Sequence, residues 1–183
     1  MSRILVRRAK VKLVAEPTEV QRVAEELEDE NWAFRSWLKA DCELDDDQLM
    51  AVVHRLTEDM TNQTDCTACA NCCRELNPSL DREDMRWLAR AIDLDVPSLQ
   101  ATHLQLGEQG HWELPAPCPL LDGNLCRVYD ARPKACREYP HLHNDFRAHS
   151  IARINDTFVC PIVFNVVEGM KAELDWLRSD EWE

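Results

Sequence analysis

Four cysteines stand within eight residues of this chain, in the order Cys-x-x-Cys-x-x-Cys-Cys. They are Cys66, Cys69, Cys72 and Cys73, and the wider-spaced Cys118, Cys126, Cys136 and Cys160 follow them. Thiolates are soft ligands that suit zinc and iron–sulfur clusters, and both kinds of centre commonly take four of them. The eight sulfurs therefore predict one or two metal centres, of zinc or of iron, and loops whose folding depends on the metal.

Disulfide bonds are the main alternative use for cysteines. No export signal is found, because basic residues interrupt every apolar run near the N-terminus, and no stretch approaches the roughly 18 apolar residues of a membrane span. We therefore expect a cytoplasmic protein that does not enter a membrane, and in the cytoplasm thiols stay reduced. The ninth cysteine, Cys42, lies between Asp41 and Glu43, whose charges disfavour a thiolate, so we expect no metal there.

The charge balance restricts the partners of the chain. The sequence carries 34 acidic residues against 21 lysines and arginines, which gives a formal net charge of −13. Such a charge repels nucleic-acid phosphates and anionic membrane surfaces, so we expect neither as a partner. Residues 1–14 form a basic arm, and the alternation of Ala9, Val11 and Leu13 with lysines predicts a half-buried strand there.

Two helices are predicted in the acidic segment that follows the arm. Thr18 and Gln21 have the spacing of a capping box ahead of an apolar stripe. Residues 45–47 are aspartates, whose negative charge favours the start of a second helix. We expect the two helices to form a hairpin. The aromatic residues between them would either cover the core or present a face to a protein partner; they are Trp32, Phe34 and Trp37.

Further helices are indicated by apolar residues at helical spacing. One helix begins near Val96, and a final helix follows Cys160. Another helix precedes them in the chain, and its buried stripe is Met85, Leu88, Ala89 and Ile92.

Short strands, turns and prolines characterise residues 111–139. The predicted fold class is therefore α+β and mainly helical: a small metal-stabilised cysteine-cluster domain with a short β-hairpin and an N-terminal helical hairpin. We predict two parts. Residues 1–60 form the basic arm and the acidic helical hairpin, and residues 61–183 form the cysteine-cluster metal-binding domain.

The division of the cysteines between centres stays open at this point. If residues 66–73 are helical, Cys66, Cys69 and Cys73 share a face while Cys72 points away, so adjacent cysteines would serve different sites. The bacterial ferredoxin pattern gives another division. It combines the first three cysteines of the cluster with a remote cysteine that precedes a proline, a condition met by Cys118 and Cys160.

A strong turn signal, Asp-Gly-Asn at residues 122–124, separates Cys118 from Cys126. A two-residue loop would pair Leu121 with Cys126 and leave the two cysteines on opposite faces, whereas a three-residue loop would align them. We predict the three-residue loop if the two cysteines share a metal. Further on, Pro133 and Pro140 bracket a single predicted helical turn that carries Cys136.

These motifs, in this order, resemble the YkgJ-type cysteine-cluster family, which is known as a zinc- or iron-chelating domain. The resemblance covers about residues 60–165, and flagellin lysine methylases include a similar domain. It implies that the cysteines of the motifs are metal ligands, with Cys160 placed less firmly than the others. Besides the cysteines, the resemblance rests on Pro119, Leu120, Val128, Tyr129, Arg132, Pro133, Arg137, Tyr139 and Pro140.

Basic residues crowd the cysteines, and they are Arg74, Arg127, Arg132 and Arg137. We interpret them as compensation for the negative charge that thiolate centres retain, with guanidinium groups that hydrogen-bond to sulfur. His141 and His143 could ligate a metal, but with eight sulfurs present we favour a surface role or a role beside the ligands.

Two classes of function fit this sequence. The first is a structural or metal-handling protein whose sites are saturated by sulfur. The alternative is an iron–sulfur enzyme or electron carrier, and the methylase resemblance hints at protein lysine methylation. No catalytic residue and no organic cofactor site can be identified, because the chain lacks glycine-rich phosphate loops and a clear acid–base pair.

Overall fold

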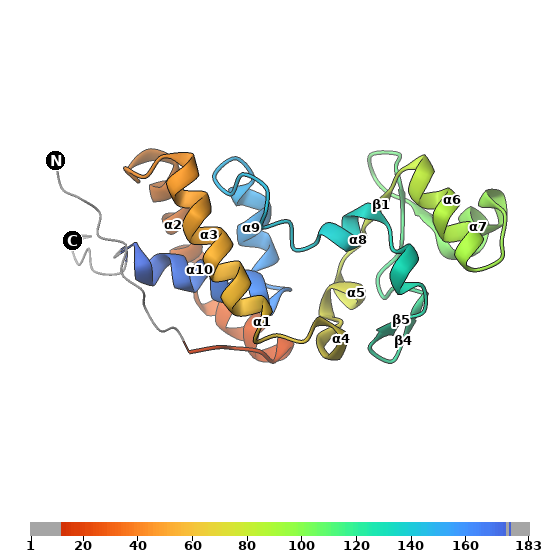
Figure 1. Ribbon diagram of the computed structural model, residues 1–183, viewed down its shortest axis with the longest axis horizontal. Helices are drawn as coiled ribbons and strands as arrows, with labels where there is room; N and C mark the ends of the chain where they lie inside the picture. The colour runs from red at the N-terminus through yellow and green to blue at the C-terminus, as the bar shows by residue number, and fades with distance from the viewer. Residues whose placement is uncertain (1–11, 175, 177–183) are drawn as a thin grey trace. The chain divides into compact units, whose positions relative to one another are not determined.

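The structure is a computed structural model, and it describes residues 12–174 and 176 (Figure 1). The chain folds into two compact units, which are described separately. The helical unit combines residues 1–65 with residues 140–183, and the cysteine unit consists of residues 66–139. The division at residue 60 stays a prediction, while compactness groups residues 12–65 with residues 140–174. Most of the strand predicted from Ala9, Val11 and Leu13 lies outside the described residues, and its described part, Lys12 and Leu13, is not in a strand.

The helical unit is built from long helices around one central helix. Val163, Val166 and Val167 of that helix have no exposed surface, because they face neighbours on several sides. The bounds are α1 Pro17–Glu26, α2 Glu28–Ala40, α3 Asp46–Thr61, α9 Ser150–Asp156 and the central α10 Pro161–Glu173. The predicted final helix is therefore confirmed. It packs most extensively against α3, a pairing that the predicted N-terminal hairpin did not include.

Two helix starts test the capping predictions. Asp45 caps α3 as a capping box, since its carboxylate accepts from the Gln48 amide at 2.8 Å and the Gln48 side chain accepts from the Asp45 amide at 3.1 Å. The box predicted from Thr18 is wrong. The first helix begins at Pro17, whose fixed φ and missing N–H suit the first helical position. Glu16 takes the cap position, so Thr18 lies inside the helix.

Buried aromatic and charged side chains complete the helical unit. Phe34 is fully buried, and its ring lies 5.9 Å from that of Trp37 and 5.3 Å from that of Trp176. Phe34 thus serves the core, whereas a partner-binding role for the aromatic group stays a prediction. Lys171, also fully buried, forms ion pairs with Glu30 at 2.8 Å and Glu168 at 2.7 Å.

Among the described residues, no single helix is long and apolar enough to cross a membrane. The pair α9 and α10 meets the test of length and composition only when the two are taken together, and the chain bends by 117° between them.

Shorter elements make up the cysteine unit. Its helices are α4 Cys66–Cys69, α5 Asn71–Glu75, α6 Arg82–Ala91, α7 Val96–His103 and α8 Lys134–Glu138, with a 3-10 turn, η1, at Tyr129–Ala131. Its strands are β1 Ser79–Leu80, β2 Gln105–Leu106, β3 Trp112–Glu113, β4 Leu121–Asp122 and β5 Leu125–Cys126. An antiparallel sheet has the order β1-β3-β2, and β4 and β5 form a hairpin. The prediction of a mainly helical α+β fold is confirmed.

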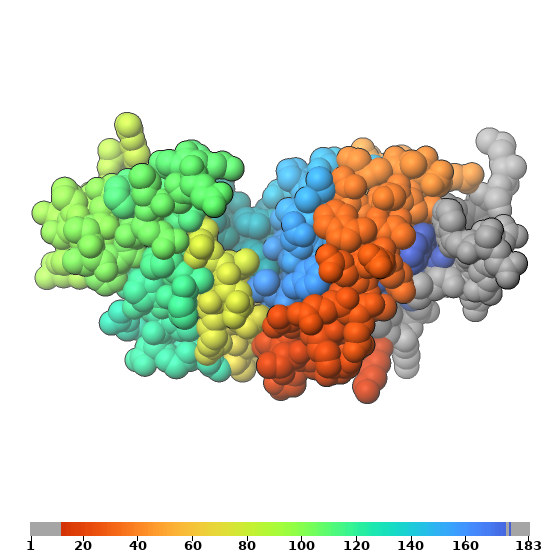
Figure 2. All heavy atoms as spheres, turned by 180° about the vertical axis from the view of Figure 1, so that it is seen from behind, coloured from red at the N-terminus to blue at the C-terminus, as the bar shows by residue number. Residues whose placement is uncertain are grey.

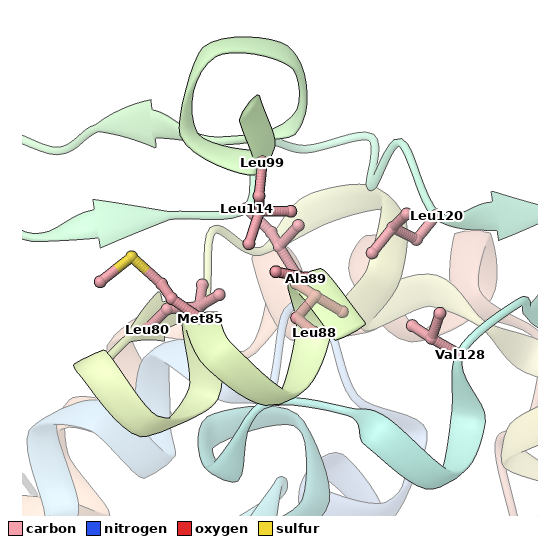
Figure 3. Packing of buried hydrophobic residues seen from close by; sticks show 8 residues of the cluster. All are labelled: Leu80, Met85, Leu88, Ala89, Leu99, Leu114, Leu120 and Val128. Carbon is pink, nitrogen blue, oxygen red and sulfur yellow. The ribbon is translucent and has the colours of Figure 1, made fainter. Parts of the chain in front are cut away.

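The core of the cysteine unit forms where α6 and α7 meet the segment before Cys118 (Figure 3). The predicted stripe of α6 supplies buried Met85, Leu88 and Ala89. The other members of this cluster are Leu80, Leu99, Leu114, Leu120 and Val128. Cys118 and Cys126 pack against the same cluster, so the hydrophobic core directly supports two of the predicted metal ligands.

Candidate metal centre

Five cysteines surround one cavity in the cysteine unit. Its volume is about 100 Å³, and its apolar wall includes the core residues Leu114, Leu120 and Val128. The cysteines that line it are Cys72, Cys73, Cys118, Cys126 and Cys136. They come from four parts of the chain, since α5, the loop at residue 118, strand β5 and α8 each contribute. The structure therefore gathers most of the predicted ligands at one place.

A break in the backbone directs Cys72 and Cys73 into this cavity. Ala70 adopts a left-handed conformation with φ 49°, which ends α4 and starts α5. The condition of one helix over residues 66–73 is therefore not met, so Cys73 does not share a helix face with Cys66 and Cys69. Cys66 and Cys69 remain on α4, and neither is among the described residues that line the cavity.

The loop at Cys118 is tied to the cysteine cluster by the backbone. The amide of Cys118 donates to the carbonyl of Cys73 at 2.8 Å, and its own carbonyl accepts from the Leu121 amide at 3.1 Å. Because these bonds bend the chain between Cys118 and Leu121, the first strand of the hairpin begins only at Leu121.

The hairpin itself has a two-residue loop, with Leu121 opposite Cys126 and Asp122 opposite Leu125. The three-residue loop predicted for a shared metal is thus wrong, yet Cys118 and Cys126 still line the same cavity. The alternation of side chains along a strand does not apply to Cys118, because that residue lies before the strand in a turn.

Cys136 is presented by α8, the single helical turn predicted from the flanking prolines. A buried carboxylate fixes the start of this turn: Asp84 of α6 accepts from the Lys134 amide at 2.8 Å. Asp84 also accepts from the Asp81 amide at the start of its own helix. One side chain therefore links α6 to α8, a role for which the sequence gives no signal.

Four of the sulfurs that line the cavity affect one another electrostatically. Burial first, and then the charges of Cys73 and Cys126, raise the pKa of Cys118. Burial also raises the pKa of Cys136 to about 12, with contributions from the other three thiolates. The four thiolates that affect one another are Cys73, Cys118, Cys126 and Cys136. Without a cation, the negative charges of these thiolates repel one another inside the cavity. A bound metal ion would offset that repulsion.

Cys73 is the member of this group that most readily becomes a thiolate. A hydrogen bond with Cys72 lowers its pKa to about 6, and the positive charges of Arg74 and Arg132 contribute. Arg132 also lines the cavity and lies over the Tyr129 ring, 3.5 Å from its centre. These charges agree with a compensating role for the arginines, whereas the predicted guanidinium–sulfur hydrogen bonds stay a prediction.

A polar network that sequence reasoning missed holds α4 against the hairpin. Arg74 donates to the carbonyls of Cys69 at 2.9 Å and Gly123 at 3.0 Å, and also to the Asn124 side chain. The amide nitrogen of Asn124 donates to the carbonyl of Ala68. In the sequence, Asn124 marks only a turn, because its partner lies 56 residues away.

The remaining predicted residues lie in the helical unit. Cys160 is 7% exposed and occupies the N-terminal cap position of α10. His141 and His143 have ring centres 6.2 Å apart. Cys42 is half-buried just after α2. The assignment of Cys160 as a metal ligand stays a prediction.

Comparison with known proteins agrees with this chemistry. Residues 65–158, just over half of the chain, match the model of the CxxCxxCC family, described as "Putative zinc- or iron-chelating domain". No curated protein and no solved structure gives a significant match.

Proposed function

Because the chain belongs to the CxxCxxCC family of zinc- or iron-chelating domains, we propose that its cysteine unit holds one metal centre through four thiolates. These are Cys73, Cys118, Cys126 and Cys136. The centre has a structural or metal-handling role. Zinc and iron both accept such a ligand set, since thiolate is a soft donor.

The single observation that carries this proposal is the convergence of four chain segments on one cavity through their sulfurs. The helices that carry Cys73 and Cys136 contain no buried residue, so hydrophobic burial contributes little to their position. A cation bound by all four sulfurs would tie these segments to the hairpin and to the core beneath it. Metal binding and folding are then one process, as in other small sulfur-ligated domains.

Elemental analysis of anaerobically purified protein tests the proposal, together with two ligand variants. Cys73→Ser and Cys126→Ser are each expected to lose most of the bound metal and to melt at a lower temperature, because three thiolates hold a metal ion less tightly than four. Cys42→Ser is the matched control, since it removes a thiol from the other unit. Unchanged metal content in both ligand variants would refute the centre.

An iron–sulfur cluster is the second candidate, and the size of the cavity favours it. A site needs only about 10–15 Å³ of such volume to hold one water-sized group. The observed volume of about 100 Å³ is several times larger, so the cavity has room for a polynuclear cluster. An electron carrier or an iron–sulfur enzyme would follow, including the protein lysine methylation suggested by the family resemblance.

The visible spectrum separates the two candidates. A brown protein that absorbs near about 400 nm and contains iron and acid-labile sulfide would establish the cluster. A colourless protein with one zinc per chain would establish the closed structural site. The analysis needs anaerobic conditions, because exposed thiolates and clusters are oxidised in air.

A further inference from the structure

Three cysteines of the cysteine unit lie outside the proposed four-sulfur centre, and they are Cys66, Cys69 and Cys72. We propose that they form a loading path that passes a divalent cation, Zn²⁺ or Fe²⁺, between solvent and the centre. This inference rests on the proposed function, because the path needs a centre at its end. It assigns a role to the first three cysteines of the motif that differs from permanent ligation.

The exposure of the sulfurs changes in order along the motif. Cys66 is exposed, Cys69 is half-buried, and Cys72 lines the cavity beside Cys73. Cys66 and Cys69 are separated by three positions in one helical turn, so their side chains lie on the same side of α4. Figure 2 shows the segment that includes α4 and α5, in yellow, at the surface of its unit beside the blue-green segment of the hairpin. A cation from solvent therefore meets the thiols in sequence order.

The loading turn, residues 66–69, is held by side-chain hydrogen bonds that do not involve its thiols. The side chains of Arg74 and Asn124 bond three backbone carbonyls, those of Ala68, Cys69 and Gly123. These bonds hold the turn to the hairpin that carries Cys126. A metal site whose ion stabilises the surrounding loop needs a permanently bound ion. The loading turn, in contrast, is held by hydrogen bonds to its backbone. Its thiols are thus positioned to exchange an ion rather than to retain it.

Each transfer along the path is a ligand exchange. An incoming thiol gives its proton to water and forms a metal–sulfur bond, and the metal–sulfur bond of the outgoing cysteine breaks while that sulfur takes up a proton. The number of bound sulfurs stays the same and the metal keeps its oxidation state. The last exchange, from Cys72 to Cys73, takes place between neighbouring residues that share a hydrogen bond.

The kinetics of metal transfer test the path. The double variant Cys66→Ser/Cys69→Ser is prepared as the metal-loaded full chain, and release of Zn²⁺, or of Fe²⁺ where the protein carries iron, is followed with an excess of a chromogenic chelator. Loading and release use the same path, so both are expected to slow by on the order of tenfold or more, because thiol exchange depends on accessible sulfur. Thr67→Ser, which alters the same turn but keeps both thiols, is the matched control.

The result that supports the proposal is a slower transfer with unchanged metal content and Tm. Loss of metal or a lower Tm in the double variant would overturn it, because Cys66 and Cys69 would then be resident ligands of a second centre. An unchanged transfer rate would overturn it as well. Failure of the proposed function gives a different result, since Cys73→Ser and Cys126→Ser would then keep their metal.

Discussion

The two units differ in what holds their helices in place. In the helical unit, α10 is buried along almost its whole length. In the cysteine unit, α4, α5 and α8 contain no buried residue, although they carry five of the cysteines. The helical unit is thus stabilised by apolar burial, whereas the cysteine-bearing helices depend on backbone hydrogen bonds and on whatever binds their sulfurs.

The two units also differ in how their buried charged groups are balanced. The buried ammonium of Lys171 in the helical unit has carboxylate partners within 3 Å, at Glu30 and Glu168. In the cysteine unit, burial and the negative charges of neighbouring thiolates raise the pKa of Cys118 and Cys136. The buried charge of Lys171 is thus balanced within the helical unit, whereas the proposed centre needs a cation to balance its thiolates. This contrast leads to predictions of decreasing size.

Removal of the metal is expected to have the largest effect, and to act on one unit only. Structural zinc contributes an apparent binding free energy of about 10–16 kcal/mol in small domains, which equals or exceeds the total stability of a typical domain. Chelation should therefore remove the hydrogen-exchange protection of α5 and α8 while α3 and α10 keep theirs. Mass spectrometry of exchanged peptides measures both units together. Equal loss of protection in both would contradict the contrast.

Truncation of a core side chain in the helical unit is expected to destabilise that unit and to leave the metal content unchanged. Phe34 is fully buried and contacts two tryptophan rings, so Phe34→Ala should cost about 3–5 kcal/mol of unfolding free energy through lost burial and a cavity. The metal content should stay the same, because no proposed ligand lies in that unit. Denaturant unfolding with elemental analysis checks both results. Ala33→Ser, an exposed change on the same helix, serves as the control.

The sequence predicts well where a periodic pattern is long enough to determine a helix. The stripes of α6 and α10 and the aspartate start of α3 all correspond to observed helices, because amphipathic spacing and helix capping are local properties. The prolines around residues 133–140 likewise predicted α8. The presence of a metal-chelating domain also follows from the motif alone, and the family match supports it.

The arrangement of the sulfurs could not be predicted, since it depends on non-local contacts. Alanine favours helix, so nothing in the sequence indicates that Ala70 adopts a left-handed conformation and divides the cysteine motif. The face of Cys118 was inferred from strand alternation, but its backbone bond to Cys73 places it in a turn instead. The link from Asp84 to α8 joins residues 50 positions apart.

That link gives a prediction of intermediate size. Asp84→Ala removes a buried acceptor and leaves the amide of Lys134 without it, at a cost of about 1–3 kcal/mol. Because α8 carries Cys136, the variant should also bind metal more weakly, which competition with a chelator measures. Glu83→Ala, one residue earlier and exposed, should change neither property. Weaker metal binding in both variants would point to surface charge rather than to the position of α8.

The smallest expected effect concerns Cys160, which decides whether the two units are chemically separate. The proposed four-sulfur centre takes all of its ligands from the cysteine unit, so Cys160→Ala should keep the full metal content. Its cost should be about 1 kcal/mol, because a buried thiol of the helical unit is lost. Elemental analysis and thermal unfolding measure the two quantities, and Cys42→Ala provides the comparison for a less buried thiol of the same unit. If Cys160→Ala instead loses metal, the eighth sulfur is a ligand as the motif predicts, and the centre draws on both units.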